Sequence, residues 1–407
     1  MKTIIIGIAD HPSPFFPPDV MEVIRQGKVF SGGKRHHEIV MPLLPPDAEW
    51  IDITVPLDHV FERYAAYATN HPDDAIVVFA SGDPLFFGFA NTIRRRLPSA
   101  EIVLFPTFNS LQTLAHRLVL PYHDLRVVSL TGRPWHEFDK ALIEKTAKIG
   151  VLTDREHSPA AIARRMLDYG YSDYQMHVGE HLGNPIAERV VTLTLEEAAG
   201  CTFDYPNCVI LTTASPQPRL FGIPECDFEL LDGREKMITK MPIRLLTLQA
   251  MELPGKQVLW DIGFCTGSVS IEARLQFPHL HVVAFEIRPE CEAIMKENCR
   301  RFGVPGIDIH IGDFLDEDLS VLPRPDAVFI GGHGGKLKEI MQKVMPMLTS
   351  GGCIVMNSVK SPAVHTDSHR LFAEACEELG LQIEPPLQLV LNQHNPIEIL
   401  KGEVMRL

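Results

Sequence analysis

The segment Val258-Leu-Trp-Asp-Ile-Gly-Phe-Cys-Thr-Gly267 decides the fold of the carboxyl-terminal half of the chain. Its first five residues are mostly apolar, which indicates a buried strand of a parallel sheet. Gly263 and Gly267 allow a tight turn and a close approach of the backbone to a ligand, because neither carries a Cβ. Ser268 follows, and a helix-compatible stretch begins at Val269, whose first N–H groups attract an anionic group. The segment therefore predicts a strand, a ligand-binding turn and a helix.

Suitable side chains follow the next two predicted strands. The apolar run His281–Phe285 ends at Glu286, 23 residues after the first glycine of the turn. A carboxylate at this distance accepts hydrogen bonds from both hydroxyls of a ribose. A third predicted strand, Ile307–Ile311, is followed by Gly312 and Asp313. A glycine turn of this kind also occurs without a ligand, but three successive strand ends with such groups favour nucleoside binding.

Two adenosine-containing cofactors use this geometry. A dinucleotide site normally has the pattern G-x-G-x-x-G, whereas the glycines here lie four residues apart and Asp261 precedes the first. This spacing favours S-adenosylmethionine. We expect its methionyl carboxylate beside the turn, its ribose on Glu286 and its adenine amine near Asp313. The predicted cofactor contacts of this half are Asp261, Gly263, Thr266, Gly267, Glu286, Gly312 and Asp313.

Composition limits the class of protein. With 407 residues, 45% of them hydrophobic, the chain is long enough for two or three domains. No apolar run is long enough to span a membrane, and Met1–Ile8 lacks the pattern of a signal peptide, so we expect a cytoplasmic protein without membrane association. The net charge of −14 argues against nucleic acid as a partner. The eight cysteines form no C-x-x-C pair, so buried reduced thiols and no protein-bound metal are expected.

The order of predicted elements indicates two different α/β domains. Residues 236–407 alternate strands and helices, including a helix over 290–302, and are expected to form a doubly wound, Rossmann-like sheet. Residues 388–391 and 397–400 are expected to close this sheet as a hairpin. Residues 1–230 are also α/β but do not repeat the pattern, and we expect two lobes, at about 1–106 and 107–230. The charged stretch 231–236 is the predicted join.

Three strand ends of the amino-terminal domain carry candidate ligand contacts. The apolar strand Ala75–Ala80 runs into the turn Ser81-Gly82-Asp83-Pro84-Leu85, where Gly and Pro fix the backbone while Ser and Asp present oxygens. Ser110 follows a second predicted strand, and Thr131 with Gly132 follows a third. Ligands of α/β proteins lie at such carboxyl ends of strands. These residues are therefore the predicted cofactor contacts of this half.

Several sequence pieces together are distinctive. They are Gly32-Gly33-Lys34-Arg35-His36, Ala80-Ser81-Gly82-Asp83-Pro84-Leu85-Phe86-Phe87-Gly88, Ser110-Leu111-Gln112, Val127 to Arg133, Gly179-Glu180-His181-Leu182-Gly183, Met237-Ile238-Thr239-Lys240 with Arg244, Trp260 to Gly263, and Thr266 to Glu272. With them the chain resembles, over nearly its whole length, the fused precorrin-6Y C5,15-methyltransferases (decarboxylating) of cobalamin biosynthesis. The amino-terminal half resembles a tetrapyrrole methylase and the carboxyl-terminal half a Rossmann-like methyltransferase.

The resemblance implies an enzyme that uses one S-adenosylmethionine per half on a small-molecule corrinoid precursor. The amino-terminal half would methylate carbon 5, and the carboxyl-terminal half would methylate carbon 15 and decarboxylate the acetate on ring C. It also implies that Thr239 contacts the cofactor and that the protein is a homo-oligomer. Whether the substrate contains cobalt stays open. Two positions depart from the family pattern: Gly7-Ile8-Ala9-Asp10-His11 keeps one glycine of a G-x-G-x-G loop, and Cys265 replaces a glycine, so its Cβ must point away from the cofactor.

The implied substrate bears many carboxylates, which calls for cationic or hydrogen-bonding partners. Lys240, Arg244, His333 and Lys360 are the candidates, because they lie in or beside segments expected at the ligand edge of the sheet. We expect positioning to dominate catalysis, without a dedicated base. Two alternatives remain at this point: a nucleic-acid or protein methyltransferase with a degenerate amino-terminal domain, and a non-catalytic corrinoid-binding scaffold.

Overall fold

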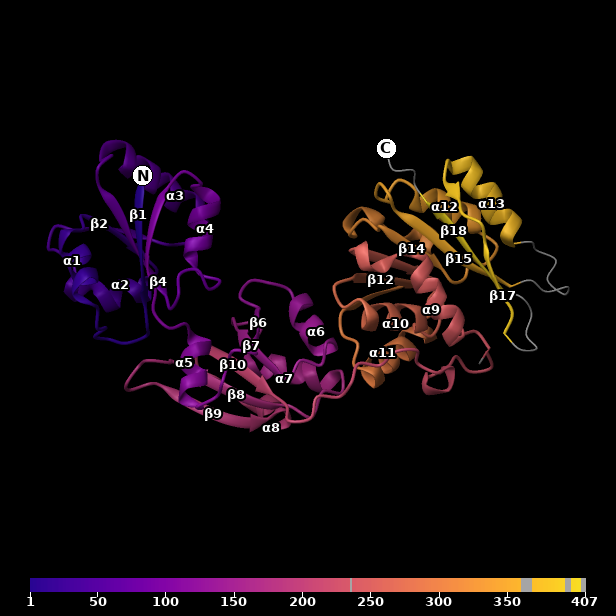
Figure 1. The fold of residues 1–407 in the computed structure, drawn as a ribbon, viewed down its shortest axis with the longest axis horizontal. Coiled ribbons are helices and arrows are strands. Elements are labelled where there is room, and N and C mark those ends of the chain that lie inside the picture. Colours follow the sequence, from indigo (N-terminus) through magenta and orange to yellow (C-terminus); the bar gives the residue numbers. More distant parts are fainter. Residues whose placement is uncertain (235, 360–367, 392–396, 404–407) are drawn as a thin grey trace. The chain divides into compact units, whose positions relative to one another are not determined.

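The computed structural model describes residues 1–234, 236–359, 368–391 and 397–403 (Figure 1). The chain forms two compact units. The first comprises Met1–Arg133, Ala147–Arg164 and Ser172–Ala214, and the second comprises Pro134–Thr146, Arg165–Tyr171 and Ser215–Leu407. Within the described ranges, no helix has both the length and the apolar character that crossing a membrane requires.

The first sheet of the first unit is wholly parallel, in the order β3-β2-β4-β1-β5. Its strands are β1 (Lys2–Ile8), β2 (Val29–Gly32), β3 (Glu49–Asp52), β4 (Ala75–Ser81) and β5 (Glu101–Phe105), and its helices are α1 (Pro18–Gln26), α2 (Lys34–Val40), α3 (Asp58–Asn70) and α4 (Phe89–Arg96). The central strands β1 and β4 are apolar on both faces, because helices cover both sides of the sheet. Because β1 and β4 are neighbouring parallel strands, their carboxyl ends lie side by side.

The second sheet of this unit is mixed, in the order β6-β7-β10-β8-β9, with only the β6–β7 pair parallel. Its strands are β6 (Arg126–Ser129), β7 (Lys148–Leu152), β8 (Gln175–Glu180), β9 (Arg189–Thr194) and β10 (Asn207–Thr212). The helices of this part of the unit are α5 (Ser110–Arg117), α8 (Leu195–Gly200) and α7 (Pro159–Asp168) up to Arg164, whereas α6 (His136–Ile143) belongs to the second unit. Helix α5 packs Leu111 and Leu114 against β10. The strands of the first sheet lie within residues 1–106, and those of the second sheet lie within residues 107–230.

The second unit is a doubly wound sheet in the order β13-β12-β11-β14-β15-β18-β16, with β17 paired to β18. Its elements are α9 (Met241–Ala250), β11 (Val258–Ile262), α10 (Ser268–Gln276), β12 (His281–Glu286), α11 (Glu290–Phe302), β13 (Ile307–Ile311), β14 (Ala327–Ile330), α12 (Leu337–Val344), β15 (Cys353–Val359), α13 (Ser368–Leu379), β16 (Gln382–Ile383), β17 (Leu387–Leu389) and β18 (Ile397–Glu403). Strands β11 to β15 are parallel and β18 is antiparallel to β15. The chain order reverses beside β11, which is where such sheets form a ligand crevice.

The predicted elements of the second unit are confirmed. Helix α11 begins at Glu290 and ends at Phe302, where Gly303 adopts a left-handed φ of +66°. Strand β17 pairs with β18, as expected of the terminal hairpin. These elements were predictable because each shows one clear hydrophobic period, and α11 also has a glycine at its end.

The boundary between the units lies upstream of the predicted join. The chain passes into the second unit for the last time between Ala214 and Ser215, so the stretch 231–236 lies inside the second unit. The reason is the apolar side chains of Ile223, Phe228 and Leu231, which are buried in the same hydrophobic cluster as the core residues of α10 and α11. The predicted join rested on the turn residues of 231–236, and the burial of these three apolar side chains has no regular sequence pattern.

The anchoring of this segment is testable. Phe228 is 4% exposed and Phe221 is 72% exposed, although both lie in the same irregular segment. Phe228→Ala should lower the free energy of unfolding of the second unit by about 3 kcal/mol, because it leaves a cavity in the core. Phe221→Ala should change it by less than about 0.5 kcal/mol. Denaturant unfolding measures both values, and equal effects would show that the segment does not belong to this core.

Candidate functional site

Two loops meet at the carboxyl ends of the neighbouring strands β11 and β14. The N–H of Gly331 donates to the carbonyl of Ile262 at 2.8 Å. Gly263 has a φ of +80°, and a Cβ at this residue would lie 2.7 Å from the backbone nitrogen of Gly332. A Cβ on Gly331 would lie 2.8 Å from the carbonyl oxygen of Gly263. Glycine is therefore required on both loops, because their backbones are in direct contact.

The turn continues with two further left-handed residues. Gly267 has a φ of +75°, and a Cβ there would lie 1.9 Å from the sulfur of Met295 on α11. Cys265 has a φ of +51° and is 7% exposed. Its side chain belongs to the hydrophobic cluster that contains Cys291 and Met295, and burial raises the pKa of its thiol. The Cβ of Cys265 is thus directed into the core, as the sequence requires for a turn that faces a ligand.

Glu286 ends β12 beside this turn and is 2% exposed. Its Oε2 accepts from the N–H of Cys265 at 2.9 Å, and its Oε1 accepts from the N–H groups of Ile287 at 2.9 Å and Arg288 at 3.2 Å. The guanidinium of Arg288 donates to both oxygens at 2.9 Å, and this pairing raises the pKa of Arg288. The structure therefore brings Glu286 to the turn, with its carboxylate fully hydrogen-bonded.

Two buried side chains near the turn keep unpaired polar atoms. Asp261 is 0% exposed; its Oδ2 accepts from the N–H and hydroxyl of Ser270, at 3.2 and 2.5 Å. Its Oδ1 has no partner within the described residues, and neither has Oγ1 of Thr266. Burial raises the pKa of Asp261 to about 7. A buried polar atom without a partner is costly, so this turn offers groups that a polar ligand could satisfy.

The loops after β13 and β14 complete the edge. The N–H of Gly312 donates to the carbonyl of Glu286 at 2.9 Å, which places Asp313 on the neighbouring strand end. Oδ1 of Asp313 accepts from the N–H of Leu315 at 3.0 Å, and its Oδ2 pairs with Lys336 at 2.8 Å, which lowers the pKa of the carboxyl. His333, in the glycine-rich loop after β14, has a pKa lowered by burial.

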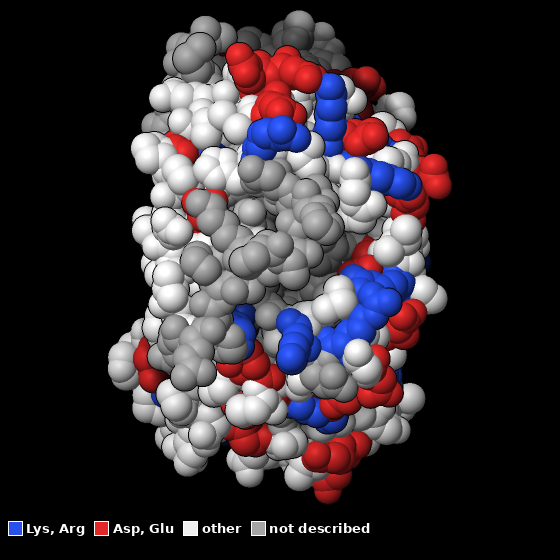
Figure 2. Space-filling model, turned by 90° about the vertical axis from the view of Figure 1, so that its right-hand side faces the viewer, with Lys and Arg blue, Asp and Glu red and all other residues white. Residues whose placement is uncertain are grey.

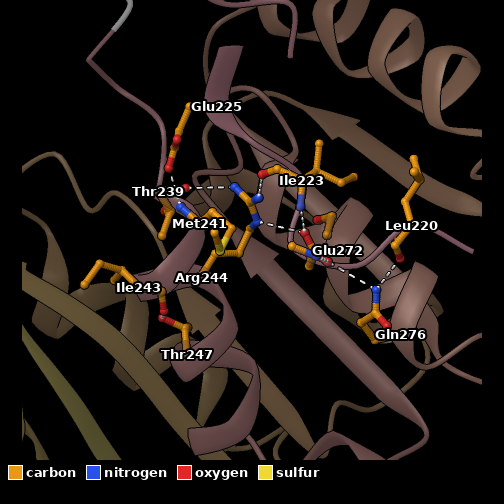
Figure 3. A network of polar contacts seen from close by, with 12 residues as sticks. Leu220, Ile223, Glu225, Thr239, Met241, Ile243, Arg244, Thr247, Glu272 and Gln276 are labelled. Atoms are coloured by element: carbon orange, nitrogen blue, oxygen red, sulfur yellow. Dashed lines mark hydrogen bonds and ion pairs between the residues drawn. The ribbon is translucent and has the colours of Figure 1, made fainter. Parts of the chain in front are cut away.

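The predicted substrate contacts lie in different environments. Arg244 is 0% exposed, and its guanidinium donates to Glu272 at 3.2 Å, to the carbonyl of Thr239 at 2.9 Å and to the carbonyl of Ile223 (Figure 3). Glu272 also accepts from the N–H groups of Gly222 and Ile223. This burial corrects the expectation that Arg244 meets a substrate carboxylate, because its donors are taken up by internal partners.

Of the two lysine candidates, the structure describes Lys240 and not Lys360. Lys240 is exposed and immediately precedes α9, and its carbonyl accepts from the N–H of Arg244 at 2.8 Å. The guanidinium of Arg244 donates to the carbonyl of Thr239, so the buried Arg244–Glu272 pair positions the Thr239–Lys240 segment. Lys360 lies outside the described residues.

The strand ends of the first unit also converge. A Cβ on Gly7 of β1 would lie 2.1 Å from the carbonyl oxygen of Gly82, and a Cβ on Gly82 would lie 2.9 Å from the Cα of Asn109. The turn Ser81–Leu85 is thus packed between β1 and the start of α5, where Ser110 is the first helical residue. The oxygen Oδ1 of Asp83 accepts from the N–H of Leu85 at 2.9 Å.

A polar cluster surrounds Ser81 that the sequence did not reveal. Its Oγ lies 3.1 Å from Nη2 of Arg35 and 2.9 Å from Nε2 of His36, whose pKa is lowered by burial to about 4. Arg35 pairs with Asp10 at 3.6 Å, and His181 lies 3.4 Å from the same carboxylate. Helix α2 supplies Arg35 and His36, the end of β4 supplies Ser81, and the segments after β1 and β8 supply Asp10 and His181, so the cluster joins parts of the chain that are far apart in sequence.

The third predicted strand end lies in the second sheet of this unit. The hydroxyl of Thr131 donates to the carbonyl of Thr153 at 3.1 Å, and the N–H of Gly132 donates to Asp154 at 2.8 Å. The guanidinium of Arg133 lies 5.3 Å from the ring centre of Phe87. These two residues line a cavity of about 370 Å³ together with Leu85, Phe86, Gly88, Asn91, Thr92 and Arg95.

One group of acids within the described ranges has the spacing of metal ligands: Glu252, Glu384 and Glu403. The Nζ of Lys401 lies 2.8, 2.9 and 3.3 Å from their carboxylates. The ammonium of Lys401 therefore already lies where a metal ion would meet these three carboxylates.

An adenosyl cofactor is compatible with the second unit. The turn at Gly263 is closed beneath by backbone contact, while a Cβ on Gly332 or Gly334 would meet nothing within 4 Å, so the outer side of the loop is open. The unpaired oxygens of Asp261 and Thr266 lie at the same turn. Glu286 and Asp313 follow on the adjacent strand ends, in the order that a nucleoside requires.

Comparison with known proteins identifies both halves. Residues 17–199 match the family described as tetrapyrrole (corrin/porphyrin) methylases, and residues 232–389 match the family described as precorrin methyltransferase domain. A precorrin-6Y C(5,15)-methyltransferase [decarboxylating] from Sinorhizobium sp is 32% identical over 90% of this chain and 87% of its own length. The chain belongs to the precorrin-6Y C(5,15)-methyltransferase (decarboxylating) family. The α/β fold predicted for both halves is confirmed.

Other members and relatives of this family cover the chain in part. A cobalt-precorrin-6B C(15)-methyltransferase (decarboxylating) from Salmonella typhi is 37% identical over 38% of this chain and 79% of its own length. A solved precorrin-6Y C5,15-methyltransferase from Geobacter metallireducens GS-15 is 32% identical, covers 46% of this chain and 98% of its own, and has a TM-score of 0.41.

The close contact at Gly263 gives a first prediction for this site. Gly263→Ala should lower the affinity for S-adenosylhomocysteine by about tenfold or more, because the new Cβ pushes the two loops apart and the residue is held at positive φ. Gly255→Ala is the matched control, since a Cβ there meets nothing within 4 Å and its φ is ordinary. Isothermal titration measures both. Equal affinities in the two variants would contradict the proposed site.

The buried carboxyl of Asp261 gives a second prediction. Its pKa is raised from 3.8 to about 7, so the folded chain retains a proton that the unfolded chain releases. The free energy of unfolding should therefore fall as pH rises from 4 to 7, by about 1.4 kcal/mol per pH unit from this group. Asp261→Asn should remove this slope, whereas Asp308→Asn, on the exposed part of β13, should leave it. Amide hydrogen exchange in β11 measures the difference.

Proposed function

We propose that this chain methylates a precorrin-6 type corrinoid precursor at carbons 5 and 15 and removes the carboxyl group of the ring C acetate, in cobalamin biosynthesis. The observation that carries the proposal is the presence of both methylase halves in one chain, aligned over 90% of its length with a relative whose name states these activities. The convergent strand ends of both units support it, because each offers a glycine turn beside polar side chains.

We propose one S-adenosylmethionine for each unit, which supplies an electrophilic methyl group. In the second unit the turn 263–267 would hold its methionyl end, Glu286 its ribose and Asp313 its adenine amine. In the first unit the turn Ser81–Leu85, Ser110, Thr131 and Gly132 would serve the cofactor. No protein-bound metal is part of the proposal.

The chemistry asks the protein mainly for positioning. Methyl transfer breaks the sulfur–carbon bond and forms a carbon–carbon bond, and the electron-rich ring carbon supplies the electron pair. The loops need to align the two reactants and exclude water. When carbon dioxide leaves, the electron pair of the broken bond enters the conjugated ring of the substrate, so no dedicated base is required.

Lys240 and His333 remain our candidates for meeting substrate carboxylates, with Arg244 positioning the Thr239–Lys240 segment. The surface favours a small-molecule substrate over a nucleic acid. On the face drawn in Figure 2, red Asp and Glu side chains border the blue Lys and Arg side chains, including the group of blue side chains in its lower half, and the net charge of the chain is −14. A phosphate backbone would instead need clustered cations.

The eight free cysteines support a reducing compartment, which we propose to be the cytoplasm. A homo-oligomer is proposed from the family resemblance alone.

Cofactor binding tests the proposal. Isothermal titration of the full chain with S-adenosylhomocysteine should give two sites per chain. Glu286→Ala should weaken one of them by about 1.5 to 3 kcal/mol, because charge-assisted hydrogen bonds to the ribose are lost. Glu292→Ala is the matched control, since this acid of α11 pairs with Lys296 on the surface and should change neither site.

The number of sites separates the alternatives. A non-catalytic scaffold would bind no S-adenosylhomocysteine, and a chain with one active half would bind one equivalent. Mass analysis of the product from metal-free and cobalt-containing precursors would then identify the substrate. Equal binding by wild type and Glu286→Ala would show that the ribose assignment is wrong.

A further inference from the structure

The carboxylate of Glu286 already has as many hydrogen-bond donors as it can accept. A carboxylate offers about four lone-pair positions. Three backbone N–H groups, from Cys265, Ile287 and Arg288, donate to it, and two side-chain donors of Arg288 donate as well. Two ribose hydroxyls could not be added to this set. Some donors must leave before Glu286 can bind a ribose.

The side chain of Arg288 is the only one of these partners that can move away without unfolding the site. The N–H groups of Cys265 and Ile287 are fixed by the turn after β11 and by the end of β12. The side chain of Arg288 has several rotatable bonds and is 23% exposed, whereas the side chain of Glu286 is 1% exposed. Arg288 therefore covers the carboxylate on its solvent side.

The position of the guanidinium also indicates where it can act after it leaves. Its Nη1 lies 3.7 Å from the sulfur of Met237, which directly precedes the Ile238–Lys240 segment. While it is bound to Glu286, its charge is neutralised and its planar donor face is occupied. Once released, it would present two parallel donors at the edge of the sheet, which is the geometry that binds a carboxylate in a bidentate manner.

We propose that Arg288 is a substrate-positioning residue that exchanges partners: it pairs with Glu286 until the ribose of the cofactor replaces it, and its released guanidinium then binds a carboxylate of the corrinoid. This inference rests on the proposed function of the second unit. It makes binding ordered, with the cofactor first, because the cation is available to the substrate only after Glu286 has turned to the ribose. Removing the guanidinium should therefore affect the two ligands in opposite directions.

Cofactor affinity is the first test. Isothermal titration of the full chain with S-adenosylhomocysteine identifies the carboxyl-terminal site as the one that Glu286→Ala weakens. Arg288→Ala should tighten that site by about fivefold, because a partly exposed competing ion pair is removed. The 2′,3′-dideoxy analogue of S-adenosylhomocysteine should show no such gain, since it has no hydroxyls that compete with Arg288. Arg300→Ala is the matched control, because Arg300 pairs with Glu297 on the surface of α11.

Substrate kinetics are the second test. Arg288→Ala should raise KM for the corrinoid in carbon 15 methylation by about tenfold, with carbon 5 methylation of the same chain unchanged. Arg288→Lys keeps the charge but loses the bidentate geometry, so its KM should lie between those of wild type and Arg288→Ala. Together with tighter cofactor binding, this opposite response is what a purely structural arginine would not produce.

The outcomes separate this inference from the function on which it rests. Weaker S-adenosylhomocysteine binding by Arg288→Ala, or an equal gain with the dideoxy analogue, would overturn the exchange of partners. An unchanged KM for the corrinoid would overturn the substrate contact. A wild-type chain with no carboxyl-terminal binding of S-adenosylhomocysteine would instead overturn the proposed function.

Discussion

The candidate site of the second unit depends on one contact, the direct approach of two backbone loops at Gly263 and Gly331. A side chain on either residue would separate strands β11 and β14 at their carboxyl ends. Because the loops touch, the turn is closed on one side, and the buried polar groups of Asp261, Thr266 and Glu286 lie at this turn. The same principle recurs in the first unit, where Gly7 and Gly82 bring β1 and β4 into backbone contact.

Burial then gives each polar residue of the site its character. Burial raises the pKa of Asp261, whereas the hydrogen bond from Lys336 lowers the pKa of Asp313. Glu286 is as buried as Asp261 but is surrounded by donors. The three carboxyl groups therefore differ in their surroundings and in readiness to accept a ligand, although all belong to one edge of the same sheet.

Much of this arrangement was predictable from sequence, because local patterns determine it. The strand–turn–helix at 258–268 and the acid at Glu286 follow from hydrophobic period and glycine spacing. What could not be predicted are contacts between distant segments: the cluster of Asp10, Arg35 and His181, and the internal partners of Arg244. A single sequence does not show which cation pairs with which acid. The unit boundary at residue 214 was not predicted, because Ile223 and Phe228 belong to no helical or strand period of apolar residues.

The pair Arg244–Glu272 has a consequence for dividing the chain. Both side chains are completely buried, and Glu272 is satisfied partly by the backbone of Gly222 and Ile223. If the carboxyl-terminal half were encoded separately and began after Ile223, the buried carboxylate of Glu272 would lose the hydrogen bonds from the N–H groups of Gly222 and Ile223. Gene fission or domain transplantation at this point therefore has to keep the chain from residue 222 onward, or supply replacement donors from a new leader sequence.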